Sequence, residues 1–151
     1  LTTGGVSVGE KDLLPGVIEN LTGNVLFHGI QVKPGMPTML SVVEDIPVLS
    51  LSGNPFAVAA LFELLAGGYL ADRAEEVYTQ KKETKVLRQT FVKTGKPKRI
   101  VKGKCDEEGV FLPQIQRNGQ LKNGIGSNCL VVFPEGERTY PEGEKVQVIR
   151  I

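Results

Sequence analysis

The chain has 151 residues, of which 40% are hydrophobic and 23% are charged, and its formal net charge is +1. This composition is typical of a soluble globular protein, and the sequence has no internal repeat and no low-complexity tract. No apolar run approaches the roughly 18 residues of a membrane span, so we expect no membrane association. The sequence starts at Leu1 without a methionine and without the basic and apolar segments of a signal peptide. We therefore expect a fragment of a longer protein or a processed product.

The two cysteines, Cys105 and Cys129, each lie in an apolar, strand-like run and form no CxxC pair. We expect two buried thiols in a reducing cytoplasm, with a disulfide or a metal pair as the alternative. One histidine, His28, and two distant cysteines do not make a zinc site, so we expect His28 to face a strand surface.

Charge is distributed unevenly along the chain. Residues 1–71 carry a net charge of −4 and residues 72–151 a net charge of +5. Ten basic residues stand between Lys81 and Lys104, against the single acidic residue Glu83. This step in charge supports a two-part architecture.

The first part predicts alternating helices and strands. Apolar spacing predicts a helix over 13–21, with Asp12 as N-cap, and strands over 25–32, 39–43 and 47–51. A loop at 33–37 separates the first two strands because two prolines and a glycine interrupt them. Asn54 and Pro55 are a good N-cap and first helical residue for a helix that runs to about Arg73. Its first ten residues are so apolar that we expect it to be buried on most sides.

After about residue 80 the pattern changes to short strands separated by turn signals. The expected strands are 86–92, 99–104, 110–114, 128–133 and 145–151. A series of this kind predicts a small β-barrel or sandwich.

Two glycine-rich turns stand between a predicted strand and a predicted helix. They are Thr2-Thr3-Gly4-Gly5-Val6-Ser7-Val8-Gly9-Glu10-Lys11-Asp12 and Leu51-Ser52-Gly53-Asn54-Pro55. Glycine lets the backbone approach a ligand, and a helix N-terminus supplies free N–H groups. With the loop Lys33-Pro34-Gly35-Met36-Pro37 between them, these turns predict a site for a phosphorylated small molecule.

These three motifs, in this order, resemble the molybdopterin molybdenumtransferases, the molybdenum insertases of the MoeA and gephyrin E-domain family. The run Val131-Val132-Phe133-Pro134-Glu135-Gly136 resembles the end of that family's last domain. The resemblance implies an α/β plus all-β fold. Residues 1–76 would be the C-terminal half of a MogA-like molybdopterin-binding α/β domain, and residues 77–151 a small C-terminal β-barrel domain.

The resemblance also implies a reaction, namely insertion of molybdate into adenylylated molybdopterin with release of AMP, assisted by Mg²⁺. The full-length protein would be a cytoplasmic homodimer. Residue by residue, Asp12 and Lys33 would be catalytic and Asp12 would hold the metal. Lys33 and Lys102 would bind the anion. The remaining positions would bind the pterin cofactor precursor: Gly4, Gly5, Ser7, Gly9, Gly53, Asn54 and Pro55.

Each of these positions also has a plain structural explanation. The glycines of the first turn could serve a tight strand-to-helix connection with no ligand. Asp12 could be only a helix cap, Lys33 only a solvated loop lysine, and residues 53–55 only a capped helix start.

The chain departs from the family pattern at several positions. Met36 stands where the family has a second lysine, Ser52 where it has a proline, and Lys102 where it has an arginine, and the serine-rich segment is reduced to 123–128. An ammonium does not reproduce the bidentate grip of a guanidinium. The alternative is therefore a carrier or sensor that binds molybdopterin or a nucleotide without inserting metal.

A nucleic-acid-binding barrel is the third possibility, prompted by the basic run at 81–104. Phe91 is the only aromatic residue in that run, which is too few for a base-stacking platform. Lysines on edge strands explain the run more simply, so we expect no nucleic-acid partner.

Overall fold

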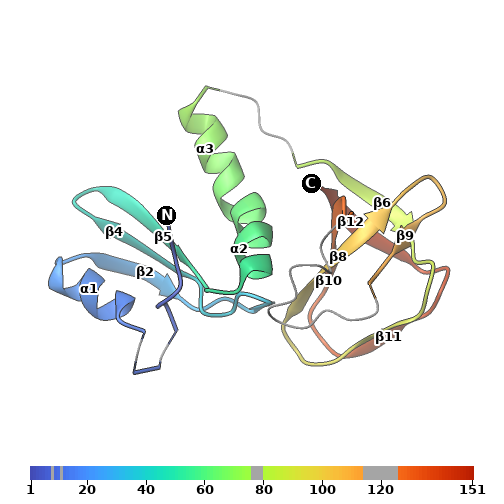
Figure 1. Ribbon diagram of the computed structural model, residues 1–151, viewed down its shortest axis with the longest axis horizontal. Helices are drawn as coiled ribbons and strands as arrows, with labels where there is room; N and C mark the ends of the chain where they lie inside the picture. Colours follow the sequence, from blue (N-terminus) through green and yellow to red (C-terminus); the bar gives the residue numbers. More distant parts are fainter. Residues whose placement is uncertain (8, 11, 76–79, 114–125) are drawn as a thin grey trace.

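The first part of the chain forms a mixed four-stranded sheet. In this computed structural model, which describes residues 1–7, 9–10, 12–75, 80–113 and 126–151, the strand order is β1-β5-β4-β2. The strands are β1 (Thr2–Thr3), β2 (Asn24–His28), β4 (Met39–Val43) and β5 (Ile46–Leu51). Strands β1 and β5 run parallel, and the other neighbours run antiparallel. Helix α1 (Leu14–Asn20) covers one face of the sheet, and a long helix lies over the other (Figure 1).

The long helix is continuous from Pro55 to Arg73 and consists of α2 (Pro55–Leu61), the π-helical turn η1 (Phe62–Ala66) and α3 (Gly67–Arg73). Its start is the one predicted, with Asn54 as N-cap. The expectation that it is buried on most sides is wrong, because only 22% of its most apolar window is buried. The expectation that no apolar run approaches the length of a membrane span is also wrong. By length and composition alone, these 19 residues are long and apolar enough to cross a membrane.

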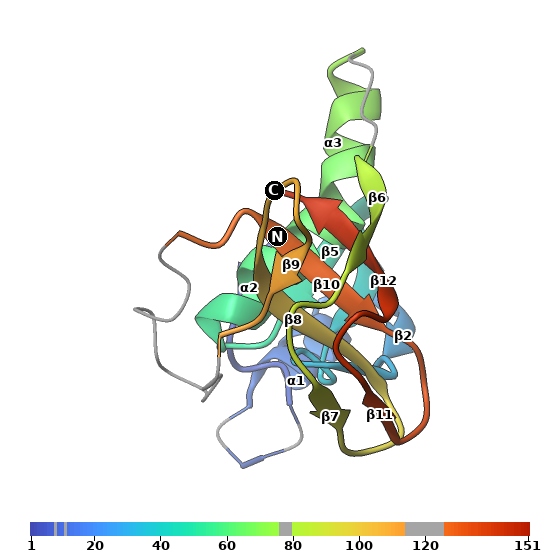
Figure 2. The ribbon, with the colours of Figure 1, turned by 90° about the vertical axis from the view of Figure 1, so that its right-hand side faces the viewer.

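The second part consists of strands that curve around one another (Figure 2). Their buried inner residues form one apolar cluster that belongs to this part alone. Its main sheet has the order β3-β8-β10-β12-β6, with β9 also paired to β8. The strands are β3 (Val32–Lys33), β6 (Lys82–Val86), β8 (Lys98–Cys105), β9 (Val110–Phe111), β10 (Cys129–Phe133) and β12 (Lys145–Arg150). A bridge between Leu87 and Val110 links the end of β6 to β9, so these strands close on themselves. A separate pair is formed by β7 (Phe91–Lys93) and β11 (Arg138–Tyr140).

Phe133 lies at the centre of the core of the second part. Its ring stacks on that of Phe91, with 4.4 Å between the ring centroids, and contacts that of Tyr140, with 4.7 Å between the centroids. Cys105 and Cys129 belong to this core as free thiols, which confirms the prediction that both are buried. Burial is the main cause that raises the pKa of Cys129 to about 12.

The two parts are joined by strand pairing and by a shared core. Strand β3, which precedes β4 in the chain, leaves the first sheet and pairs in parallel with β8. A second apolar cluster takes buried residues from both parts: Leu51, Ala60 and Leu61 from the first, and Ile100, Leu130 and Ile149 from the second. The Lys33–Pro37 loop is therefore held between the two parts.

Several predicted elements need correction. The strand predicted over 25–32 ends at His28, because Gly29 has a φ of +104° and its N–H donates to the carbonyl of Thr38. The strand predicted over 86–92 is replaced by β6 and β7, and β11 was not predicted. Residue 114 and residues 123–125 of the segment 123–128 lie outside the described residues. The coarse prediction of mixed α and β structure in several sheets is confirmed.

Candidate functional site at the glycine turns

The structure brings the two predicted glycine turns into contact. The N–H of Gly4 donates to the carbonyl of Leu51 at 2.9 Å. A Cβ placed on Gly53 would lie 3.5 Å from the Cα of Gly4. Gly4 and Gly5 have φ values of +81° and +64°, which glycine adopts without strain. The turns follow parallel strands β1 and β5 at their carboxyl ends, where open α/β sheets bind ligands.

Three buried hydroxyl groups without a hydrogen-bond partner gather beside this contact. They belong to Thr2, Ser50 and Ser52, and within the described residues they are the only buried side-chain polar atoms left unpaired. Thr2 lies opposite Ser50 in the β1–β5 register, and Ser50 is 0% exposed. A buried hydroxyl without a partner costs about 1–3 kcal/mol, so such groups in one place are typical of a site that a ligand or water completes.

The sequence analysis missed this hydroxyl group cluster. Its signal was present, because Ser50 and Ser52 alternate with the leucines of an otherwise apolar strand and therefore share a face with each other.

The start of α2 does not offer the free N–H groups that the sequence predicted. The Oδ1 of Asn54 accepts from the N–H groups of Phe56 and Ala57 at 3.0 and 3.2 Å. Pro55, the first helical residue, has no N–H to donate. The Asn54 side chain therefore uses the N–H groups that an anion would otherwise bind. A ligand could still approach the backbone of the glycines closely.

The first turn is stabilised internally by Asp12. Its Oδ2 accepts from the N–H of Gly9 at 3.0 Å, and its own N–H donates to the carbonyl of Gly9 at 2.9 Å. The prediction that Asp12 caps α1 is wrong, because the N-cap position is Leu13 and no side chain caps it. Ser7 is half-buried in the same turn. His28 reaches this turn from β2, with its Nε2 2.6 Å from the carbonyl oxygen of Val6.

The Lys33–Pro37 loop packs against α2. A Cβ on Gly35 would lie 2.3 Å from Cδ1 of Leu61, so only glycine fits there. Lys33 itself is exposed on β3. Lys102 approaches the start of the same helix from β8, with its Nζ 4.7 Å from the ring centroid of Phe56. Three features therefore lie next to α2: the glycine turns, the Lys33–Pro37 loop and Lys102.

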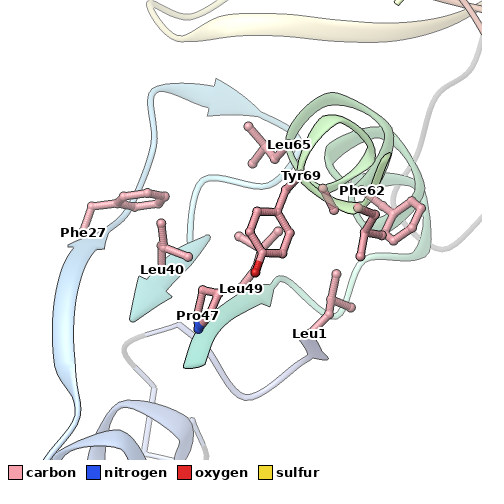
Figure 3. A pocket seen from close by; sticks show the side chains of 10 residues that line it. Leu1, Phe27, Leu40, Pro47, Leu49, Phe62, Leu65 and Tyr69 are labelled. Carbon is pink, nitrogen blue, oxygen red and sulfur yellow. The ribbon is translucent and has the colours of Figure 1, made fainter. Parts of the chain in front are cut away.

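An apolar groove lies between the long helix and the sheet (Figure 3). It encloses about 360 Å³, and Tyr69 points into it opposite Leu49. It includes none of the predicted site residues; it is lined by Leu1, Phe27, Leu40, Pro47, Leu49, Phe62, Leu65, Ala66, Tyr69 and Leu70. The groove and the candidate site are separate features.

The glycine turns at the carboxyl ends of β1 and β5 are typical of α/β proteins that bind a ligand at this edge of the sheet.

Comparison with known proteins shows which family of such proteins the chain resembles. Residues 1–72 match the family described as "Probable molybdopterin binding domain". The molybdopterin molybdenumtransferase of Bacillus subtilis is 31% identical over 160 aligned residues, covering 100% of this chain and 36% of the relative. That of Staphylococcus aureus strain COL is 30% identical, covering 99% of this chain and 37% of the relative.

A solved structure agrees with these relatives. The molybdopterin biosynthesis MoeA protein of Pyrococcus horikoshii superposes with a TM-score of 0.80 at 27% identity, covering 99% of this chain and 36% of its own. The chain belongs to the MoeA family of molybdopterin molybdenumtransferases, as a divergent member. It spans about a third of the length of the relatives that it matches.

Proposed function

We propose that this chain is part of a molybdopterin molybdenumtransferase that works in molybdenum cofactor biosynthesis. The protein would insert molybdate into adenylylated molybdopterin and release AMP. The observation that carries this proposal is the contact between the Gly4 and Gly53 turns beside the unpaired hydroxyl groups. Two relatives that carry the name molybdopterin molybdenumtransferase, and that align with 99–100% of this chain, support the proposal.

In this proposal each group has a defined task. Gly4, Gly5, Ser7, Gly9 and Gly53 let the phosphate and pterin approach the backbone closely. The unpaired hydroxyl groups of Thr2, Ser50 and Ser52 supply hydrogen bonds that fix the orientation of the ligand.

The basic residues would handle the anion. Lys33 attracts the molybdate anion. Lys102 stabilises the start of α2 through Phe56 and adds positive charge beside Asn54 and Pro55.

Asp12 fits a Mg²⁺ that is bound together with substrate. Mg²⁺ usually takes one or two carboxylates and completes its coordination with water and substrate phosphates. Asp12 uses Oδ2 for Gly9, which holds the carboxylate in place on the turn. In the part of the chain that the structure describes, no group of three or more His, Cys, Asp or Glu residues could hold a metal alone. When bound, Mg²⁺ would neutralise negative charge on the phosphoanhydride.

We also propose the wider organisation that the family implies. Residues 1–76 would be the C-terminal half of the molybdopterin-binding α/β domain, and residues 77–151 the β-barrel domain. The full-length protein would be a homodimer. A cytoplasmic location is supported by the two free thiols, which are usual in a reducing compartment.

A second candidate is a carrier or sensor that binds the pterin without turnover. It is favoured by Met36 in place of a family lysine, since this substitution removes one charge-assisted contact. A contact of that kind is worth about 1.5–3 kcal/mol.

The test uses the full-length protein with adenylylated molybdopterin, Mg²⁺ and molybdate, and follows AMP release and activation of an apo-molybdoenzyme. We expect molybdate-dependent AMP release. Pterin binding without AMP release would favour the carrier, and Met36→Lys with Lys102→Arg should then restore turnover. No pterin binding would overturn both candidates.

A matched pair of variants tests the location of the site. Gly53→Ala adds a methyl group where the turns meet, at an ordinary 3.5 Å contact and without a positive φ. We expect it to weaken pterin binding at least about tenfold, equivalent to 1.4 kcal/mol. Gly16→Ala, in α1 with nothing within 4 Å of the added carbon, should leave binding unchanged. Equal effects of both variants would place the ligand elsewhere.

A further inference from the structure

Strand β2 is interrupted by a bulge at Leu26. Its pairing with β4 places Val25 opposite Ser41. Phe27 is opposite Leu40, the next residue of β4, so Leu26 is the extra residue. Side chains alternate between the two faces of a sheet, and one extra residue exchanges the faces of all positions that follow it. Bulges are frequent next to active sites, where they change the direction of a side chain.

The bulge determines which side chain of β2 faces the first glycine turn. His28 is opposite Met39, which belongs to one buried cluster with Val6 of that turn. Phe27 lies on the other face with Leu40, where both line the apolar groove (Figure 3). Strict alternation along β2 would exchange the two rings, because Phe27 would then be opposite Met39 and His28 would lie on the groove face.

His28 holds one peptide unit of the first glycine turn. Its Nε2 lies 2.6 Å from the carbonyl oxygen of Val6, and Nε2 is the donor because a carbonyl oxygen only accepts. The preceding carbonyl, that of Gly5, accepts from the N–H of Leu14 at 3.0 Å. Among the described residues, His28 is the only side chain from outside 4–14 that hydrogen-bonds to this turn. One carbonyl is therefore held by the backbone and the next by His28.

The N–H groups of the same two peptide units are available to a ligand. In a trans peptide the C=O and the N–H point in opposite directions, so the N–H groups of Val6 and Ser7 point away from the groups that hold the carbonyls. Within the described residues, neither of these N–H groups has a hydrogen-bond partner. They follow directly on Gly4 and Gly5, which both have a positive φ. Successive N–H groups in a turn of this kind form a concave site for an anion.

We propose that His28 is a positioning residue for ligand binding at the first glycine turn. This rests on the proposed function, in which the turn binds the pterin nucleotide. The imidazole acts without touching the ligand. Its Nε2–H holds the carbonyl of Val6 and thereby keeps the N–H of Ser7 directed at an anionic group of the ligand. The bulge at Leu26 is what brings the imidazole to this carbonyl.

The test measures binding of adenylylated molybdopterin to the full-length protein by isothermal titration calorimetry, in the absence of molybdate. His28→Phe keeps a ring but removes the donor, and His28→Gln supplies an amide N–H that can replace Nε2–H. We expect His28→Phe to raise the Kd about three- to tenfold, as loss of one hydrogen bond does, and His28→Gln to restore it to within about twofold. Asn24→Ala is the control and should leave the Kd unchanged, because Asn24 is exposed at the start of the same strand.

Two results would overturn the proposal. An unchanged Kd in His28→Phe would show that the turn keeps its conformation without the hydrogen bond. A Kd for His28→Gln as high as that for His28→Phe would show that the donor is not what matters, since an amide would not rescue a purely steric role of the ring. Thermal melts check that the variants are folded. His28→Asn, whose shorter side chain does not reach as far as Nε2, should bind as weakly as His28→Phe and replaces it if that variant does not fold.

A second measurement separates this proposal from the proposed function. Hydrogen–deuterium exchange of the ligand-free full-length protein reports on the turn through Gly9, Asp12 and Leu14, whose N–H groups are hydrogen-bonded within it. We expect faster exchange there in His28→Phe than in the wild type and in His28→Gln. This result in a protein that does not bind adenylylated molybdopterin would reject the transferase and support His28 as the residue that fixes the turn. AMP release and exchange at wild-type rates in His28→Phe would support the transferase and reject the role of His28.

Discussion

The two parts of the chain differ in how completely they bury their apolar residues. The second part places eleven buried residues in one core of its own, around Phe133. The first part has only Val6, Ile18 and Met39 in a buried cluster of its own and shares a second cluster with the strands of the second part. Among the described residues, twelve exposed large hydrophobic side chains belong to the first part and four to the second.

The second part therefore has a larger apolar core of its own than the first part has. Closed strands bury both their backbone edges and their inner side chains, so the second part has what it needs for stability. The first part exposes the edge of β1 and an apolar groove beside the long helix. Exposed apolar surfaces of this kind are typical of interfaces with other protein segments. The first part also carries the glycine turns, so the candidate site lies on the half with the smaller core of its own.

Expressing the two parts separately is the test of this difference with the largest expected effect. We expect residues 80–151 expressed alone to unfold cooperatively in urea, because their main core is complete. We expect residues 1–75 alone to show no cooperative transition, because half of their second cluster would be missing. Circular dichroism against urea concentration distinguishes the two. A cooperative transition for residues 1–75 would mean that the shared cluster is dispensable.

A core substitution should separate the parts within the intact chain. Phe133 is fully buried and contacts two other rings, so Phe133→Ala should cost about 3–5 kcal/mol of unfolding free energy. Phe62 lines the groove and is 40% exposed, so Phe62→Ala should cost less than about 1.5 kcal/mol. Urea unfolding of both variants gives the two values. Similar losses would show that the groove is already packed in solution.

The sequence predicted those elements that local signals determine. The cap at Asn54 and the strand at 39–43 follow from residue preference and from turn residues on either side. Burial of the long helix was mispredicted because apolar composition does not say which segment covers it. The pairing of Lys33 with Arg99 joins residues far apart in the chain, and no local pattern encodes such a register. For the candidate site, the glycine turns could be predicted from motifs, whereas the hydroxyl groups became visible only once burial was known.

Filling the space at Gly35 should weaken the junction between the parts. Gly35 has a φ of +110°, and a Cβ there would overlap Leu61, which is itself buried. Backbone strain and overpacking together predict a loss of about 2–4 kcal/mol for Gly35→Ala, measured by urea unfolding. Gly143→Ala is the matched control, since its φ is +86° but nothing lies within 4 Å of the added carbon. It should cost about 1–2 kcal/mol from strain alone. Equal losses would mean that Leu61 moves aside freely.

A buried lysine connects two turns of the second part. Lys93 is 2% exposed, and its Nζ donates to the carbonyl of Gly95 at 2.7 Å and to that of Gly136. Lys93→Met keeps an unbranched side chain that is one atom shorter and leaves both carbonyls unpaired, so we expect a loss of about 1–3 kcal/mol in a thermal or urea melt. Lys96→Met, at an exposed position nearby, should change stability by less than about 0.5 kcal/mol. A stable Lys93→Met variant would show that water satisfies these carbonyls.

The smallest expected effect lies at the edge of the second part, between Glu83 on β6 and Arg150 on β12. The Nε and Nη2 of Arg150 donate to the two carboxylate oxygens of Glu83 at 3.0 and 3.3 Å. These hydrogen bonds are the main cause that lowers the pKa of Glu83 from its ordinary value of 4.5. A lowered folded pKa means that the pair stabilises the fold above about pH 4.5 and loses this contribution as the pH falls through the folded pKa.

Glu83→Gln should therefore lower the urea midpoint slightly at pH 7, and the difference from the wild type should shrink to zero below the folded pKa. Both groups are open to solvent screening, so added salt should shrink the difference at pH 7 as well. Glu107→Gln removes an exposed carboxylate with no ion pair to a described residue and should show neither dependence. A midpoint difference that stays constant across this pH range would assign the contribution of Glu83 to packing. The edge of the closed strands would then owe nothing to charge, and the stability of the second part would rest on its core alone.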